Sequence, residues 1–418
     1  MFTSLPQQVE AFKAYKWEDI QPFYDELVKR PFSQETVTSW MADWAKLRNL
    51  ILERFAKLRL ANTQNTKDEA VETELQSFLK NIHSPAQTFN NKLTRRLLES
   101  GLKIDGMELP LKKMRAESDL FSEDNLPLLT QEVKYSSQFN RTMGSQTVEW
   151  EGESRTLIQM RTLFDSPDRA HRQEVWQKMS ARQLEDRGSL NALWQSLFKL
   201  RREIAQNAGF DSYLAFRWQL LKRFDYTPQD SLVFHEAIAE KVVPAASRIY
   251  QQLADSFGVE KLRPWDVAND TQPLMYPKLT PMRAVDELAT KTAAMFHHVG
   301  EEFGAYFETM RQENLLDLPN HASKAPGGYC TYFAVEKRPF ILMNAVGSAG
   351  DVRTMLHEAG HAFHAFESNH LPYPDQRHSG HEFSEVASMA MELLASPYLT
   401  SEFGGFYDSH EEAARQVG

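Results

Sequence analysis

The sequence contains a single cysteine, Cys330, among its 418 residues. One cysteine excludes a disulfide within the chain and any metal site built from several thiolates. The sequence also lacks a run of about 18 apolar residues, the length that a membrane-spanning helix needs. Residues 1–8 do not show the charged and apolar segments of a secretory signal. These absences predict a soluble cytoplasmic protein that does not bind a membrane, with Cys330 as an ordinary buried or loop residue.

Acidic side chains outnumber basic ones. The chain has 47 Lys and Arg residues against 57 Asp and Glu residues, a formal net charge of −10, and no basic run. Nucleic-acid binding depends on clustered basic side chains that neutralise phosphates, so we expect no nucleic-acid partner. The charged fraction of 25% and the hydrophobic fraction of 42% are those of a globular protein. Nothing in the composition indicates an oligomeric state.

Helical periodicity dominates what is present. Residues 35–60 place Trp40, Trp44, Leu47 and Ile51 at spacings of three and four, which is typical of an amphipathic helix. The same periodicity predicts helices over 17–28, 69–82, 88–98, 166–208, 212–222, 227–257 and 280–307. The last of these is expected to begin at Thr280-Pro281, because proline favours the first helical turn. The pattern predicts a mainly α fold.

Two short regions favour strands instead. Residues 146–157 alternate polar and apolar side chains around Glu151-Gly152, which indicates a β-hairpin. Residues 329–334 are strand-like, and residues 339–344 form an apolar run bounded by turn residues, as a buried strand does.

The strongest chemical signal is His357-Glu358-Ala359-Gly360-His361. Ser348 and Asp351 resemble a capping box that would start a helix through this motif. On a helix the two histidines lie about 40° apart and can reach one metal ion, while Glu358 is rotated by about 100° and can hold a water instead. This is the arrangement of a zinc hydrolase, with two His ligands and a Glu general base. The alternative is a buried helix with two structural histidines, which would need other partners.

The identity of the third metal ligand decides to which class of zinc hydrolase the motif belongs. A metzincin would have Gly at 364 and His at 367, and the chain has His364 and Glu367 there. A carboxylate from a later helix is the other common solution, and Glu385 follows His361 by 24 residues in a helical segment, 383–394. Its apolar neighbours predict that Glu385 is buried. Rivals for the third position are Glu382, Glu392, His378 and His381.

The sequence leaves the roles of Glu392 and His364 undecided. Glu392 shares a helix face with Glu385, so it either orients a ligand or forms a surface ion pair. His364 follows His361 by three residues, so it either contacts the site or is a core histidine.

Several segments together resemble M3 metallopeptidases of the oligoendopeptidase F kind, from about Trp17 to the chain end. They are 357–364, 383–394, 339–344, 202–213 and 146–150. The resemblance implies a helical, zincin-like peptidase with a small β-region beside the active site and a deep channel for short peptides. It implies one Zn²⁺ held by His357, His361 and Glu385, with Glu358 as the general base. It also implies that strand 339–344 pairs with the substrate backbone and that residues 327–329 form a loop over the cleft.

One departure from the family concerns the oxyanion donors. In the family a His and a Tyr well downstream of the third ligand supply them, whereas this sequence ends 33 residues after Glu385. Tyr398, Tyr407 and His410 are too close to Glu385 for that role. We therefore expect a chain truncated at its C-terminus that binds zinc and cleaves poorly.

The predicted organisation is an N-terminal helical region, 1–150, ending in the hairpin, and a zinc peptidase catalytic region, 151–418. The leading function is a zinc-dependent endopeptidase. The alternatives are a metallocarboxypeptidase with the same type of zinc helix and a non-catalytic peptide-binding protein. The intact Glu358 argues against the latter, because binding alone needs no general base.

Overall fold

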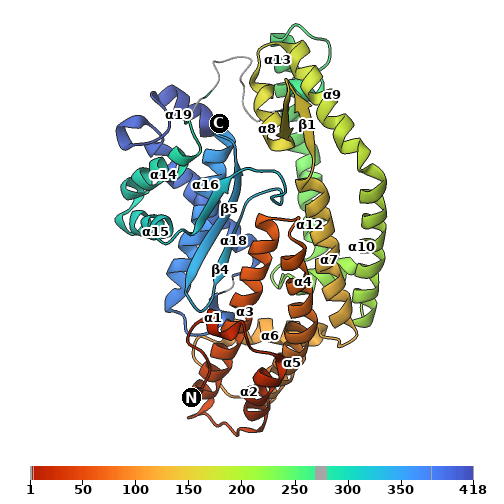
Figure 1. Ribbon diagram of the computed structural model, residues 1–418, viewed down its shortest axis with the longest axis vertical. Coiled ribbons are helices and arrows are strands. Elements are labelled where there is room, and N and C mark those ends of the chain that lie inside the picture. The colour runs from red at the N-terminus through yellow and green to blue at the C-terminus, as the bar shows by residue number, and fades with distance from the viewer. Residues whose placement is uncertain (1, 3, 269–278, 280, 378, 418) are drawn as a thin grey trace.

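The computed structural model describes the chain except for residues 1, 3, 269–278, 280, 378 and 418. Figure 1 shows three groups of elements: N-terminal helices at one end, long helices along one side, and a small sheet with the C-terminal helices on the other side. None of the described helices combines the length and apolar character that a membrane span needs.

The N-terminal group is built around α3 (Val37–Gln64), whose aromatic and aliphatic side chains fill a continuous core. The predicted helices are confirmed here, with a short π-helical segment (Leu79–His83) joining two of them. The others are α1 (Val9–Phe12), α2 (Trp17–Lys29), α4 (Glu69–Phe78), α5 (Ser84–Glu99), α6 (Glu108–Leu120) and α7 (Asn125–Gly144).

The predicted hairpin is confirmed. Strands β1 (Thr147–Trp150) and β2 (Glu153–Thr156) pair antiparallel, with Trp150 opposite Glu153. Glu151 has φ 52° and Gly152 has φ 84°. Positive φ at both loop residues matches the twist of a two-residue hairpin. The division of the chain at residue 150, which is the last residue of β1, stays a prediction.

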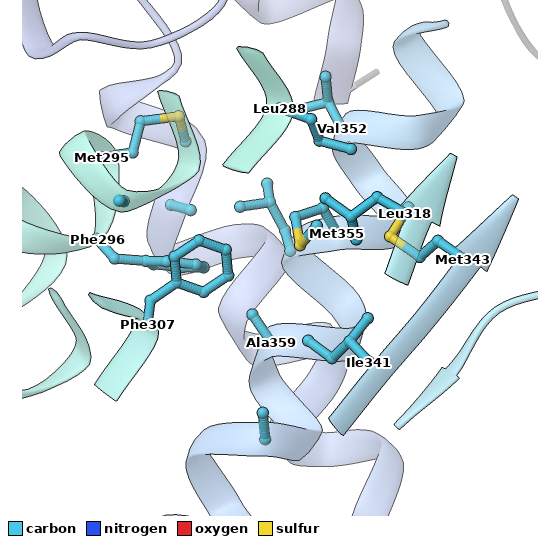
Figure 2. Close-up of a cluster of buried hydrophobic side chains, with 14 of the residues drawn as sticks. Leu288, Met295, Phe296, Phe307, Leu318, Ile341, Met343, Val352, Met355 and Ala359 are labelled. Atoms are coloured by element: carbon cyan, nitrogen blue, oxygen red, sulfur yellow. The ribbon is translucent and has the colours of Figure 1, made fainter. Parts of the chain in front are cut away.

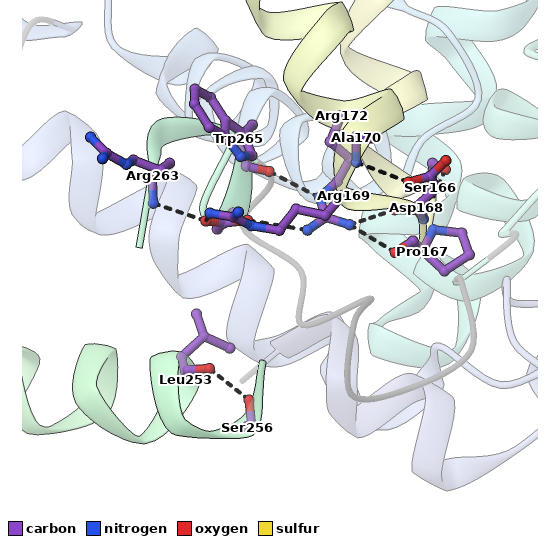
Figure 3. A network of polar contacts seen from close by, with 11 residues as sticks. Ser166, Pro167, Asp168, Arg169, Ala170, Arg172, Leu253, Ser256, Arg263 and Trp265 are labelled. Carbon is purple, nitrogen blue, oxygen red and sulfur yellow. Dashed lines mark hydrogen bonds and ion pairs between the residues drawn. The ribbon is translucent and has the colours of Figure 1, made fainter. Parts of the chain in front are cut away.

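The middle helices α9 (Arg169–Glu185), α10 (Arg187–Asn207), α11 (Tyr213–Leu220), α12 (Pro228–Ala237) and α13 (Val243–Ser256) lie within the predicted stretches 166–208, 212–222 and 227–257. The first stretch is divided into two helices at Asp186, and the short helix α8 (Leu157–Arg161) was not predicted. Figure 3 shows the polar network that holds the end of this group together. The buried Asp266 carboxylate accepts from Arg169 Nε at 2.9 Å and Arg172 Nη2 at 3.2 Å, which fastens the segment after α13 to the start of α9.

The prediction of one helix over 280–307 is wrong. Helix α14 spans Asp286–Val299, a break follows at Gly300, and α15 spans Glu301–Gln312. Pro281 lies before the helix, and Thr280 lies outside the described residues. The two helices pack closely because Gly304 has no side chain: a Cβ there would lie 2.2 Å from Nδ1 of His297. The apolar periodicity of the sequence continues across residue 300, but the packing of α15 against α14 requires the chain to turn there.

The second β-region forms a three-stranded sheet in the order β3–β5–β4. Strand β5 (Arg338–Ala345) is central and buried, β4 (Tyr329–Phe333) pairs with it antiparallel, and β3 (Leu316–Pro319) pairs with it parallel. The strands predicted over 329–334 and 339–344 are confirmed, whereas β3 was not predicted. The expectation that strand 339–344 pairs with substrate is wrong, because neighbouring strands occupy both of its edges.

Helix α16 (Ala349–Glu367) carries the histidine motif and packs on the sheet. The predicted capping box is present: Ser348 N–H donates to Asp351 Oδ2 at 2.7 Å, and Asp351 N–H donates to Ser348 Oγ at 3.3 Å. Figure 2 shows Val352, Met355 and Ala359 of α16 within the apolar cluster between β5 and α14. The remaining helices are α17 (Pro374–Arg377), α18 (His381–Ala395) and α19 (His410–Val417).

Candidate metal centre

Helices α16 and α18 bring the three predicted ligands together. The rings of His357 and His361 project from one face of α16, with their centroids 5.1 Å apart. Glu385 of α18 places Oε2 3.2 Å from Nε2 of His357 and 3.7 Å from Nε2 of His361. One possible ligand atom from each residue lies within 4.8 Å of those of the other two.

These donors fit a divalent transition metal. Two imidazole nitrogens and one carboxylate oxygen, with a position left for water, are a common donor set of catalytic zinc sites. Nδ1 of His357 lies 2.8 Å from Glu392 Oε1. A carboxylate oxygen accepts, so Nδ1–H of His357 is the donor in this contact, and Nε2 is the ring nitrogen on the side of Glu385. Glu392, which the sequence left open, therefore orients a candidate ligand.

Glu358 lies beside these groups in a buried position. It is 6% exposed, and its Oε2 has no hydrogen-bond partner among the described residues. Burial raises the pKa of Glu358 to about 7, while the charge of His357 and the backbone N–H of Cys330 act in the opposite direction. A buried carboxylate with a free oxygen and a pKa near neutrality is suited to accept and return a proton.

The electrostatic surroundings also favour a neutral His361. Burial lowers the pKa of this imidazole, the Glu385 charge opposes that effect, and His357, His364 and His381 lower it further. A neutral imidazole is the form that binds a metal. His364 and His381 thus lie close enough to act on His361 through their charges, although neither belongs to the set of converging ligand atoms.

The other residues considered as third metal ligand, and Cys330, have different surroundings. Glu382 accepts hydrogen bonds from Arg223 Nε at 2.7 Å and from the Tyr226 hydroxyl at 2.6 Å. His378 lies outside the described residues. Cys330 sits in β4, where burial and then the Glu358 charge raise the pKa of its thiol.

The three residues considered as oxyanion donors also have contacts of their own. Tyr398 stacks on His298, Tyr407 donates to Gln416, and His410 pairs with Glu402.

The expectation that Glu385 is buried among its apolar neighbours is wrong. The Glu385 side chain is 38% exposed, and Phe383, Val386 and Met389 are 74%, 59% and 59% exposed. Helix α18 buries a different face, formed by Ser388, Met391 and Ala395.

Sequence reasoning missed Ser388, whose Oγ lies 3.0 Å from Glu385 Oε2, although a serine three residues after a ligand was a signal available in the sequence. It also missed that Gly360 lies directly against the backbone of Ala387 and Ser388.

A cavity of about 570 Å³ opens beside the candidate metal centre. Thr354 of α16, Glu392 of α18 and Gly328, which precedes β4, line one side of it, and Arg161 and Thr162 line it from α8 and the turn after it. Glu392 contacts His357, so the cavity adjoins the converging ligands.

Known proteins share both the sequence pattern and the fold. A model of peptidase family M3 matches residues 162–416, more than half of the chain. The structure matches a putative oligoendopeptidase F from Bacillus anthracis with a TM-score of 0.88 and 24% identity, over 96% of this chain and 73% of that one. It also matches PZ peptidase A with an inhibitor, with a TM-score of 0.88 and 26% identity, over 96% and 71% of the two chains.

The chain is also similar to the oligopeptidase PepF of Bacillus subtilis, with 31% identity over 102 residues. The matched segment is 24% of this chain and spans only 15% of that protein's length.

Proposed function

Because the chain belongs to peptidase family M3, we propose that it is a zinc-dependent endopeptidase that hydrolyses internal bonds of short peptides. In this proposal His357, His361 and Glu385 hold one Zn²⁺, and Glu358 is the general base. One observation carries the proposal: three metal-ligating atoms converge within 4.8 Å beside a buried glutamate with an unpartnered oxygen. Two structural matches named for peptidases, at 26% and 27% identity, support it.

The chemistry divides between the ion and the chain. A bound zinc would supply a Lewis acid for the peptide carbonyl and for water. Glu358 removes a proton from the attacking water, whose oxygen forms the new bond to the carbonyl carbon. As the C–N bond breaks, Glu358 passes that proton to the leaving amine, so it ends the cycle as it began.

The substrate backbone is proposed to add to β4 as a further strand. Strand β4 lies at an edge of the sheet, and the Cys330 N–H in this strand acts on the Glu358 carboxylate, so this edge faces the site. Antiparallel pairing, the commoner kind, would direct the C-terminal side of the peptide toward Gly327 and Gly328. These glycines line the cavity beside the metal centre.

The location is proposed to be the cytoplasm. The chain has one cysteine and therefore cannot form the internal disulfides that are typical of proteins in oxidising compartments.

The test uses a short peptide blocked at both termini. The zinc-loaded protein should cleave it at an internal bond, a chelator should abolish cleavage, and added zinc should restore it. Failure with the blocked peptide but cleavage of the same peptide with a free C-terminus would favour the metallocarboxypeptidase. Binding without cleavage of either peptide would favour the non-catalytic peptide-binding protein.

A further inference from the structure

We propose that Gly360 and Ser388 are positioning residues that hold the Glu385 carboxylate against the two histidines. This inference rests on the proposed metal site and adds two residues that touch neither substrate nor metal. Gly360 sets how closely α18 approaches α16, and Ser388 sets where the carboxylate points once α18 is there.

Gly360 lies in the contact between the two helices. A Cβ at this position would lie 2.6 Å from the Ala387 carbonyl oxygen and 2.6 Å from the Ser388 Cα. Both are backbone atoms, so a methyl group at 360 would force the helices apart. Glycine within a helix costs about 1 kcal/mol relative to alanine, and the close approach of α18 is the compensating gain.

The same helix spacing governs two contacts to His357. Glu385 and Glu392 both belong to α18, and they lie 3.2 Å from Nε2 and 2.8 Å from Nδ1 of this histidine. A displacement of α18 would therefore lengthen the contact to the candidate ligand and the contact that orients the imidazole. For this reason we expect a larger effect from Gly360 than from Ser388.

Ser388 acts on the carboxylate itself. Its side chain is fully buried, and its Oγ lies 3.0 Å from Glu385 Oε2 and 3.0 Å from the Glu385 carbonyl oxygen. The bonded Oε2 is the oxygen that faces both histidines. The Glu385 side chain is 38% exposed, so apolar packing does not enclose it. The single Ser388 hydroxyl proton has both of these Glu385 oxygens as acceptors, and its bond to Oε2 restricts the rotamers of the Glu385 side chain.

The test compares Gly360→Ala and Ser388→Ala with two matched controls in α10. Gly188→Ala places a methyl group where nothing lies within 4 Å. Ser196→Ala removes a hydroxyl that bonds only the Ala192 carbonyl oxygen. Zinc affinity is measured by competition with a chromophoric chelator, and ligand geometry by the visible absorption of the Co²⁺-substituted protein. Neither readout requires activity.

Zinc affinity should fall by about 10- to 100-fold in Gly360→Ala and by about 10-fold in Ser388→Ala, with altered Co²⁺ spectra. Both controls should match the unmodified protein. Should Gly360→Ala fail to fold, Ser388→Ala and Ser388→Cys still decide, because a thiol is a weak donor of similar size and should give an intermediate affinity.

Unchanged affinity and spectra in Ser388→Ala and in a folded Gly360→Ala would overturn the inference. A different result would overturn the proposed function itself: an unmodified protein that binds no zinc. The two failures are therefore distinguishable.

Discussion

Helices α3 and α16 each bury a glutamate, and the two carboxylates have different surroundings. Glu53 of α3 is fully buried and accepts the backbone N–H groups of Val335 at 2.6 Å and Glu336 at 3.0 Å, with Lys57 Nζ 3.2 Å away. Glu53 Oε1 and Glu358 Oε2 are both buried oxygens without a hydrogen bond among the described residues, but Glu53 Oε1 lies 3.2 Å from Lys57 Nζ. Burial raises the pKa of both.

The different surroundings indicate a structural role for the Glu53 carboxylate and a role in proton transfer for the Glu358 carboxylate. The partners of Glu53 fasten the turn between β4 and β5 to α3, so its burial is offset by charge-assisted hydrogen bonds. An unsatisfied buried group costs about 1–3 kcal/mol, and Glu358 is kept at that cost beside the converging ligands. A buried carboxylate oxygen without a hydrogen bond therefore does not mark the site by itself, because both glutamates have one; Glu358 differs because it adjoins the converging ligand atoms.

The largest contrast is expected between Glu358→Gln and Glu53→Gln. The first should lower kcat by about 10² to 10⁴, because a general base is lost while the zinc ligands remain. The second should leave kcat unchanged and lower the free energy of unfolding by about 1–3 kcal/mol, because Gln is a weaker acceptor for the two N–H groups. Steady-state kinetics, zinc content and urea denaturation measure the three quantities.

The control for Glu358→Gln is its own metal content, which should equal that of the unmodified protein. A Glu53→Gln variant that loses as much kcat as Glu358→Gln, with a normal stability, would remove the distinction between the two carboxylates.

Core packing should show the next largest difference between the two regions. Leu47 of α3 is fully buried, and Leu393 of α18 is 66% exposed. Leu47→Ala should destabilise the protein by about 2–5 kcal/mol, whereas Leu393→Ala should change stability by no more than about 0.5 kcal/mol. Urea denaturation of both variants checks this. A loss at Leu393 as large as that at Leu47 would mean that this face of α18 is covered in solution.

Local patterns predicted what depends on neighbours in the sequence. The Ser348–Asp351 cap, the turn at Glu151-Gly152 and the shared face of His357 and His361 all follow from spacings of a few residues, and the structure contains each of them.

Contacts between elements far apart in the sequence determine the features that the local patterns did not predict. The side of α18 that meets α16 depends on Gly360, 25 residues before Glu385, so the apolar neighbours of Glu385 gave the wrong burial. Strand β3 is only four residues long and ends in Pro319, which local strand patterns do not reveal. Its pairing with β5 decides that β4, and not β5, forms an edge.

The N-terminal group should carry a pH dependence of its own. Burial beside Phe55 and Phe78 lowers the pKa of His83 from 6.5 to about 4. Between these values the unfolded chain binds a proton that the folded chain refuses, so stability is complete above pH 6.5 and falls as the pH drops toward 4. The loss is at most about 3 kcal/mol.

Urea denaturation at several pH values measures this effect. His83→Leu should flatten the dependence over that range, and His410→Ala, at a histidine 80% exposed, should leave it unchanged. An identical slope in His83→Leu and the unmodified protein would refute the assignment to His83.

A further effect in the site region concerns Glu392, the partner of His357 Nδ1. Glu392→Gln weakens the partner that orients His357 and should lower zinc affinity by about 10- to 100-fold. Glu402→Gln is the matched control, because Glu402 pairs with the exposed His410. Competition with a chelator measures both. Equal affinities in the two variants would contradict an orienting role for Glu392.

The most direct test is calorimetric titration of zinc into the metal-free protein. With His357, His361 and Glu385 as ligands, one ion should bind per chain, and Glu385→Ala should weaken this binding by at least about 100-fold. Unchanged affinity in a folded Glu385→Ala variant, or no binding by the unmodified chain, would contradict the account.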